Sequence, residues 1–395
     1  MKRFALLSAF AVLSSSACSG SVPLPAGFTP VVARAGVAAR IQHIVIVVQD
    51  QRSFDNVFAG FPGADAPTYG LLRTGARTPL RVTTLHPGAG CAIAAGAQSF
   101  LTAYDDGKMD GFDRLDRKQP LCPYTRIARS ETKPYWSLAK RYTIADRTFA
   151  STYWGGFVNR QYLVAGTTRV GRDEYDIGLP TALPLGCDAP AGARTTVVTR
   201  KGILTNRGPF PCFTYPTMAQ RLDAKSISWR YYVDENQGES FNAYGAVKYV
   251  REGPDWKSDV ISPTTRVLSD LKGGTLAQVS WVVGSDDPAW VESVANAARK
   301  SRYWSHLAMI VLWASDGNEN FYDNVPPPNY GRLLGLGLRV PMIVISPYAK
   351  RGFISHTVYE TGGSTLRFIE ETFGLRSLGA SDVYANSIGD CFQRR

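Results

Sequence analysis

The chain has 395 residues, 44% of them hydrophobic, which is enough for one large domain with a continuous core or for two ordinary domains. Lys and Arg total 44 against 33 Asp and Glu, so the net charge of +11 favours encounter with phosphate esters, lipid headgroups or envelope polymers. The basic residues form no long run and accompany no zinc-finger or RNA-recognition signature, which argues against nucleic acid as a partner.

The first residues are typical of an export signal. A basic start precedes an apolar segment over residues 4–12, which is too short to span a bilayer, so we expect residues 1–17 to be a signal peptide. Cys18 follows at the place where bacterial lipoproteins are acylated, but Ser15 stands where that pattern usually has Leu. Both a lipid anchor on Cys18 and release into the periplasm or the medium fit this sequence. No later stretch is apolar for long enough to predict a transmembrane helix.

Residues 18–39 are rich in Pro, Ala, Gly and Val and have no periodicity, which is typical of a flexible tether. We expect one α/β domain over residues 40–395, with a surface insertion over residues 180–216, where Gly, Pro and Thr are frequent.

The cysteines that follow Cys18 lack the close spacing of a zinc or redox motif. In an oxidising compartment, such cysteines usually form structural disulfides. The simplest pairing joins Cys91 to Cys122 and Cys187 to Cys212, although the sequence leaves the connectivity open.

Short continuous apolar runs recur along the chain. They suit strands that are buried on both faces of a parallel sheet, and Gly and Pro at most of their flanks favour strands over buried helix segments. Between them lie helical patterns, the clearest over residues 364–374, with Ser364 placed to cap the start and Gly374 at the end. Strands that alternate with helices predict an α/β sheet. The apolar runs are Ile44–Val48, Val279–Val283, Leu307–Trp313 and Val340–Ile345.

Polar side chains follow two of these runs directly. Asp50 and Gln51 come after the first run, and Asp316 comes three residues after the third. In an open parallel sheet, ligands gather at the carboxyl ends of the strands, so these oxygens predict a site for a divalent metal. The alternative is that each carboxylate caps the next helix, and spacing alone favours that alternative.

Seven segments, in order, resemble motifs of the bacterial phosphoesterase family that contains phospholipases C and acid phosphatases. Together they cover roughly residues 40 to 375, and ordered matches of this kind are far more specific than a single motif. The segments are HIVIVVQDQRSFDNVFAGFPG from His43, DDGKMDGF from Asp105, FASTYWGGFVNRQYLVAGT from Phe149, SISWRYYVDE from Ser226, LAQVSWVVGSDDP from Leu276, DGNENFYDNVPPP from Asp316 and GLRVPMIVISPYAKRGFISHTVYE from Gly337.

This resemblance implies an alkaline-phosphatase-like fold, a three-layer α/β/α sandwich around a mostly parallel sheet. It also implies a mechanism in which a Ser or Thr oxygen attacks phosphorus beside a bound divalent metal, and histidines protonate the leaving oxygen.

Matched residue by residue, the chain departs from the family at most positions that carry chemistry. Asp50 and Gln51 replace Glu and Asn metal ligands and keep an oxygen donor at each position. Gly156 stands where the family has its Ser or Thr nucleophile, so that nucleophile is absent. Ser151 and Thr152, four or five residues earlier, would replace it only if the loop were rebuilt.

Several of the family's histidines and one of its two adjacent acidic residues are also replaced. Asp316 is followed by Gly317 where the family has two adjacent acids, and Asn324 matches a family histidine. His356 matches another family histidine and is the best candidate for an active-site role. The retained pair Asn159 and Arg160 matches positions around the cleft and is a candidate for substrate contact. Three further expected histidines are replaced, by Ala95, Asp287 and Thr361.

Two functions fit these residues. The first is an exported phosphoesterase whose metal, held by Asp50, Gln51 and Asp316, activates water directly. The second is a non-catalytic protein of the cell envelope that holds an anionic ligand in the same cleft. The residues favour the second function and the family resemblance favours the first, so the sequence leaves enzymatic activity open.

Overall fold

The computed structural model describes residues 40–86, 93, 96–178, 183–234, 242–284, 286–315, 320–329 and 333–393. The expected signal peptide and tether, and the expected ligand Asp316, lie outside these residues. Among the described residues, no helix is both long and apolar enough to cross a membrane.

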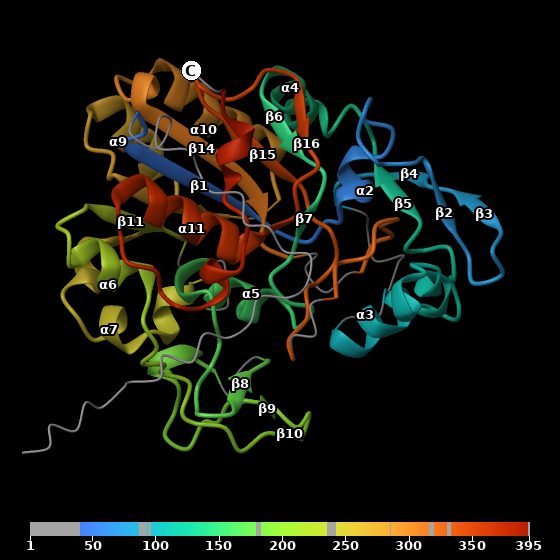
Figure 1. Ribbon diagram of the computed structural model, residues 1–395, viewed down its shortest axis with the longest axis horizontal. Helices are drawn as coiled ribbons and strands as arrows, with labels where there is room; N and C mark the ends of the chain where they lie inside the picture. Colours follow the sequence, from blue (N-terminus) through green and yellow to red (C-terminus); the bar gives the residue numbers. More distant parts are fainter. Residues whose placement is uncertain are drawn as a thin grey trace, which may run out of the picture.

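An eight-stranded sheet forms the centre of the molecule, with the strand order β12-β11-β13-β1-β14-β15-β6-β16 (Figure 1). All of its strands run in one direction except β15, which is antiparallel to both of its neighbours. In sheet order the strands are Val260–Ile261, Trp229–Tyr232, Val279–Val283, His43–Gln49, Leu307–Trp313, Met342–Ile345, Thr143–Ala145 and Phe353–Ser355.

The side chains of β1 alternate between two hydrophobic cores, one on each face of the sheet. Ile44, Ile46 and Val48 contribute to one core, and Val45 and Val47 to the other. All five are essentially buried, and full burial of such a side chain contributes about 1.5–3 kcal/mol. A run without polar interruption is therefore what a strand covered on both faces requires.

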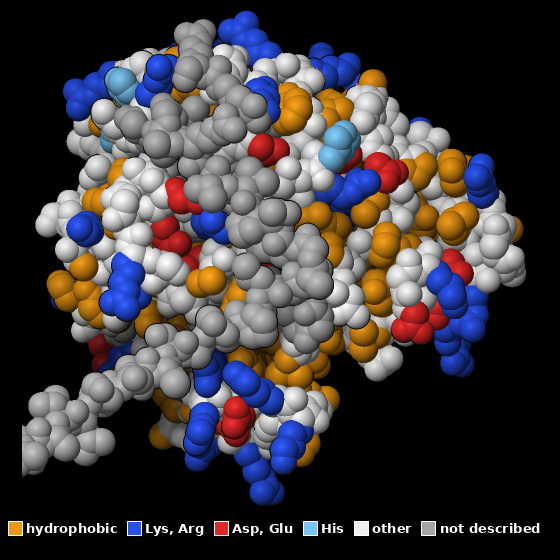
Figure 2. Space-filling view, in the orientation of Figure 1, with side chains coloured by type: hydrophobic (Ala, Val, Ile, Leu, Met, Phe, Trp, Pro, Cys, Tyr) orange, Lys and Arg blue, Asp and Glu red, His pale blue; other side chains and the backbone are white. Residues whose placement is uncertain are grey.

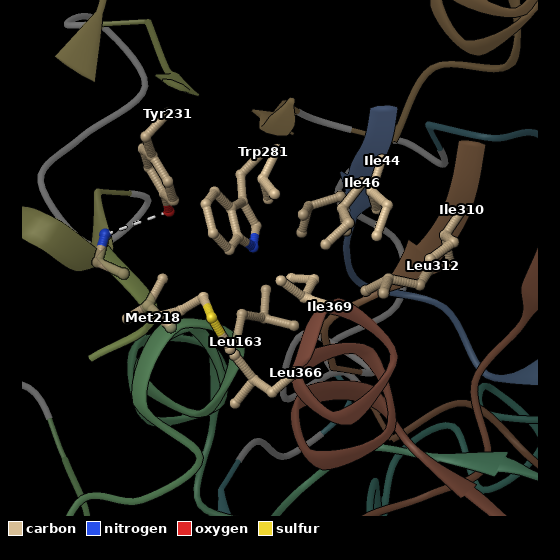
Figure 3. Close-up of a cluster of buried hydrophobic side chains, with 14 of the residues drawn as sticks. Ile44, Ile46, Leu163, Met218, Tyr231, Trp281, Ile310, Leu312, Leu366 and Ile369 are labelled. Carbon is tan, nitrogen blue, oxygen red and sulfur yellow. Dashed lines mark hydrogen bonds between the residues drawn. The ribbon is translucent and has the colours of Figure 1, made fainter. Parts of the chain in front are cut away.

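Helices cover both cores and complete three layers. The first core packs under α5 (Gly156–Ala165), α6 (Met218–Asp223) and α11 (Thr361–Phe373), and Figure 3 shows side chains of these helices meeting those of the sheet. The second core packs under α4, α9 and α10, which span Lys133–Arg141, Arg266–Gly273 and Pro288–Lys300. The predicted three-layer α/β/α sandwich with a mostly parallel sheet is confirmed.

The predicted strands agree closely with the observed ones, and two boundaries differ. The run over residues 340–345 begins as a strand only at Met342, because Pro341 cannot donate a backbone hydrogen bond to the sheet. Helix α11 begins at Thr361 and not after Ser364, whose hydroxyl instead accepts a hydrogen bond from the Glu360 N–H at 2.9 Å. The predicted helix end is correct, since Gly374 caps α11 in a left-handed conformation.

Smaller elements surround the sandwich. Within the expected surface insertion, β9 (Val197–Thr199) and β10 (Leu204–Thr205) join β8 (Glu174–Asp176), which precedes it, in a three-stranded antiparallel sheet. The remaining helices and strands are α2 (Phe54–Phe58), α3 (Ala97–Tyr104), α7 (Lys248–Arg251), α8 (Asp255–Ser258), β2 (Tyr69–Leu71), β3 (Arg77–Pro79), β4 (Arg81–Thr83), β5 (Thr125–Ile127), β7 (Thr148–Phe149) and β17 (Tyr359–Glu360).

One of the two expected disulfides is observed directly. Cys187 and Cys212 are bonded, with their Cα atoms 4.4 Å apart. Cys122 is also disulfide-bonded, and its expected partner Cys91 lies outside the described residues. Cys391 is a free, fully buried thiol.

Candidate functional site

One edge of the central sheet gathers the polar residues of the candidate site. The parallel strands all end there, and β15 begins there because it runs the opposite way. Backbone hydrogen bonds continue past the strands, from Ala314 N to Gln49 O at 2.9 Å and from Gln51 N to Ser315 O at 3.1 Å. The side chains placed at this edge come from Asp50, Ser315, Asp286, Asp146, His356 and Arg339.

Asp50 is buried and its carboxylate is fully engaged. Oδ1 accepts a hydrogen bond from the Ser315 hydroxyl at 2.7 Å and another from the Gln51 backbone N–H at 3.1 Å. Oδ2 accepts from the guanidinium of Arg160, and the two side chains of this ion pair are only 7% and 3% exposed. A fixed cation from the protein therefore neutralises Asp50.

Gly156 and Arg160 lie one turn apart on α5, so both face Asp50. A Cβ atom added to Gly156 would lie 3.6 Å from Asp50 Oδ2 but only 2.9 Å from Arg160 Nη1. Gly156 and Asp50 therefore lie side by side at the edge of the sheet. The guanidinium of Arg160 would have to shift to admit a side chain at position 156.

The loop that leads into α5 is held by the side chain of Asn159. Its amide oxygen accepts from Thr152 N at 3.0 Å, and its amide nitrogen donates to the carbonyls of Thr152 at 2.8 Å and Gly155 at 3.0 Å. Gly155 has φ +104, a conformation that side chains other than glycine rarely adopt, and it lets the chain turn into the helix. Asn159, a candidate for substrate contact, is fully buried and binds this loop.

The two hydroxyls near the nucleophile position are also buried. Ser151 Oγ lies 3.1 Å from Thr361 Oγ1 and accepts from Gly362 N at 2.9 Å. Thr152 is 1% exposed. Thr361, which replaces an expected histidine, thus fixes the start of α11 to this loop.

Asn324, at another expected histidine position, belongs to a buried ionic network centred on Arg339. The guanidinium of Arg339 pairs with Asp55 and Asp323 at 2.9 Å each and donates to Asn324 Oδ1 at 2.9 Å. The Asn324 amide donates in turn to Asp65 at 2.7 Å. Burial, together with the charge of Asp323, holds the pKa of Asp55 well above its usual range.

His356 forms a dyad with Asp146. Its Nδ1 lies 2.8 Å from Asp146 Oδ1, and the imidazole is 62% exposed while the carboxylate is completely buried. Asp146 also accepts from the Asp65 backbone N–H at 3.1 Å. In the tautomer whose Nδ1–H donates to Asp146, Nε2 is a hydrogen-bond acceptor. Sequence reasoning missed Asp146, although it directly follows strand β6.

A second group of buried polar side chains lies behind Asp50. The Tyr135 hydroxyl is within 2.9 Å of Gln49 Oε1 and 2.8 Å of Asp286 Oδ1, and Asp286 Oδ2 accepts from Arg52 at 3.1 Å. Burial raises the pKa of Asp286 to about 6, against the opposing charge of Arg52. Asp287, which replaces an expected histidine, caps α10 by accepting from two of its backbone N–H groups.

A cavity of about 600 Å³ opens beside α5, at the ends of β11 and β12. It begins at Phe157, next to Gly156, and combines apolar walls with basic and acidic side chains. Its lining includes Phe157, Leu185, Trp256, Ile261, Lys257, Arg266, Asp188 and Asp234. A larger cavity of about 1040 Å³ lies between α5 and the β8–β10 segment and reaches Ser151.

The expected metal ligands lie only partly among the residues that the structure describes. Within them, no three His, Cys, Asp or Glu side chains are grouped so that they could hold a metal ion. Asp50 is engaged by Arg160 and Ser315, and Gln51 is exposed, with a backbone φ of 70°. The third expected ligand, Asp316, and the Ala95 position lie outside the described residues.

Two solved structures superimpose on this chain with low TM-scores and about 10% sequence identity. A protein of the alkaline phosphatase superfamily from Vibrio parahaemolyticus superimposes with a TM-score of 0.42 and 10% identity, over 92% of this chain and 75% of that one. A putative sulfatase from Bacteroides thetaiotaomicron gives a TM-score of 0.44 and 9% identity, over 90% and 76%.

Sequence comparison is more specific. The model of the Phosphoesterase family matches residues 41–376, and the chain belongs to this family. The non-hemolytic phospholipase C of Pseudomonas aeruginosa is 26% identical over 87% of this chain, and phospholipase C A of Mycobacterium tuberculosis is 27% identical over 85%. The chain covers 55% of the first relative and 73% of the second, so it spans about half the length of the Pseudomonas protein.

Proposed function

We propose that this protein is an exported member of the Phosphoesterase family that binds a phosphate ester, or a similar anionic ligand of the cell envelope, and does not form a covalent phosphoenzyme. One observation carries the proposal: the guanidinium of Arg160 lies against both Asp50 and Gly156, at the place where the family resemblance calls for a metal and a nucleophile.

The attacking group decides whether covalent phosphoryl transfer is possible. Covalent phosphoryl transfer needs an oxygen nucleophile and a cation or base that ionises it. Gly156 supplies no side-chain oxygen, and Ser151 and Thr152 are buried in hydrogen-bonded positions. Arg160 neutralises Asp50, but a guanidinium cannot accept a proton near neutral pH.

The features that remain are suited to recognition. Lys257 and Arg266 lie in the lining of the 600 Å³ cavity, and Phe157 and Trp256 give it apolar walls. Cations beside an apolar wall fit a phosphate ester that carries an apolar substituent. The excess of positive charge over the whole chain strengthens encounter with such a ligand.

A second candidate function is hydrolysis by directly activated water, and the dyad of His356 and Asp146 favours it. A buried carboxylate holds the exposed imidazole at 2.8 Å, the arrangement that a general base requires. In this case the protein would be a phosphate-ester hydrolase of phospholipase C or acid phosphatase type, and no protein nucleophile would be needed.

The two functions differ in turnover. We would measure hydrolysis of an aryl phosphate and of phosphatidylcholine with divalent metals supplied, and search for a phosphoenzyme by mass spectrometry after acid quench. The proposal expects binding of an aryl phosphate by calorimetry, no turnover and no phosphoenzyme. It also expects Arg266→Ala to weaken binding, whereas Lys300→Ala, at the exposed end of α10, should not. Turnover that is lost in His356→Gln would establish the second function.

A further inference from the structure

Apolar and basic side chains lie together at the turn between β9 and β10, which we call the hairpin tip (Arg200–Leu204). Its geometry is well defined: Thr199 N donates to Ile203 O at 3.0 Å, and Gly202 N donates to Thr199 O at 2.8 Å. Gly202 has φ +76, as expected for glycine in a three-residue hairpin turn. The tip is thus preformed.

Two large apolar side chains are exposed there. Ile203 and Leu204 are each 59% exposed. Ile203 ends the turn and Leu204 begins β10, so both apolar side chains lie exposed at the end of the hairpin. At the base of the same hairpin, Val197 and Val198 are buried, which fixes the projecting end to the body of the protein.

The residues beside these apolar side chains are basic. The stretch TRKGILTNR, residues 199–207, contains Arg200, Lys201 and Arg207 and no acidic residue. Arg200 pairs with Asp173 at 3.4 Å, but both side chains are about 60% exposed, so water screens this pair strongly. Figure 2 shows Lys and Arg side chains gathered on the lobe that carries β8–β10.

We propose that the hairpin tip docks the protein on an anionic lipid bilayer. Ile203 and Leu204 would enter the boundary between headgroups and acyl chains, while Arg200, Lys201 and Arg207 contact the lipid phosphates. The exposed apolar side chains match the acyl-chain region of such a bilayer, and the flanking cations match its anionic headgroups. Each basic residue near the surface adds to the electrostatic attraction to these headgroups. Charge complementarity therefore favours a bilayer over another protein. This proposal does not depend on the function of the cleft.

The test measures binding of the full chain to lipid vesicles by co-sedimentation. Vesicles of phosphatidylcholine containing phosphatidylglycerol are compared with vesicles of phosphatidylcholine alone, at low and high salt. The variants are Ile203→Ser with Leu204→Ser, which keeps the charge, and Lys201→Gln with Arg207→Gln, which keeps the apolar residues. The matched control is Val82→Ser with Leu101→Ser, two other exposed apolar residues, 59% and 46% exposed, outside the β8–β10 lobe.

We expect the wild type and the control to bind the anionic vesicles equally, and each tip variant to bind at least about tenfold more weakly. Added salt should weaken the wild type more than the charge variant. Circular dichroism spectra equal to that of the wild type would show that the variants fold, as exposed substitutions predict. Failure of the wild type to bind anionic vesicles, or equal binding by the tip variants, would overturn the proposal. Calorimetry of aryl phosphate binding tests the cleft separately.

Discussion

Two buried arginines at the same edge of the sheet have different surroundings. Arg339 is shared by two carboxylates, Asp55 and Asp323, and also binds Asn324. Arg160 pairs with Asp50, beside a glycine. Burial raises the pKa of both carboxyl groups in the first arrangement, and the charge of Asp323 raises that of Asp55 further, while the second arrangement joins the Arg160 guanidinium to the Asp50 carboxylate.

The difference shows which part of the site serves the fold. Arg339 connects α2, the start of β15 and the segment around Asn324, three pieces far apart in sequence. Arg160 connects α5 to the end of β1 and, through Asp50, to the adjacent Ser315. We infer that the Arg339 network holds the scaffold, and that the Arg160 pair takes the place of the family's chemistry.

The largest effect should follow loss of Arg339, the centre of the buried network. Arg339→Met leaves two buried carboxylates without their cation, and breaking a buried pair in this way costs about 3–5 kcal/mol. Urea unfolding should show a loss of at least this size or no folded protein. Arg367→Met, which removes a more exposed pair with Glu371, should cost less than about 1 kcal/mol. Similar losses in the two variants would contradict the scaffold role.

Arg160→Met should cost about 3 kcal/mol of unfolding free energy, because it leaves Asp50 buried and charged. The double variant Asp50→Asn with Arg160→Met removes both charges and should recover much of this loss. Urea unfolding of the two single variants and the double variant measures the coupling directly. Additive losses would mean that the ion pair contributes nothing to the native state.

A smaller effect is expected at the position of the missing nucleophile. In Gly156→Ser the new Cβ would lie 2.9 Å from Arg160 Nη1, so the guanidinium must shift, at a cost of about 1–3 kcal/mol. We expect no hydrolysis of an aryl phosphate from this change alone. Gly273→Ser in α9, where a Cβ meets nothing within 4 Å, is the matched control for stability. Strong activity of Gly156→Ser would show that a functional metal site already exists.

Restoring activity should require several changes at once, because residues that act as a unit are strongly non-additive. We expect measurable turnover only when Gly156→Ser is combined with a rebuilt metal shell and proton donor. Restoring the histidine at position 324 would also cost stability, because Asn324→His breaks the hydrogen bonds of Asn324 to Asp65 and Arg339. The further changes are Asp50→Glu, Gln51→Asn, Gly317→Asp and Asn324→His.

The smallest effect concerns pH. Because the folded pKa of Asp55 lies above its unfolded value, the folded state holds a proton that the unfolded state has lost. Stability should therefore decrease as the pH rises from about 4 through the folded pKa. Asp55→Asn cannot ionise and should show a flatter profile in urea unfolding measured between acid and neutral pH. An unchanged profile would place the pH dependence in another group.

Much of the fold could be predicted from the sequence, because strands buried on both faces leave continuous apolar runs. The runs at Ile44–Val48, Val279–Val283 and Leu307–Trp313 all became strands of the central sheet. The start of α11 was missed because Thr361, Gly362 and Gly363 are weak helix formers, and their close packing on α5 and the turn after α11 decides the boundary.

The candidate site was only partly predictable. Resemblance identified Asp50, Gly156 and His356, but the partners of these residues come from distant segments that leave no local pattern. Asp146, which orients His356, follows a strand of only three residues. The direction of the Arg160 side chain toward Asp50 is a property of the packed site, and sequence alone suggested substrate contact for Arg160.

The central claim is that Arg160, and not a metal ion, neutralises Asp50. The most direct test is the divalent metal content of protein purified without chelator, for the wild type and for Asp50→Asn. The account predicts far less than one metal ion per chain in the wild type and no change in the variant. One metal ion per chain, lost in Asp50→Asn, would contradict the account and would restore metal-dependent hydrolysis as the function to test.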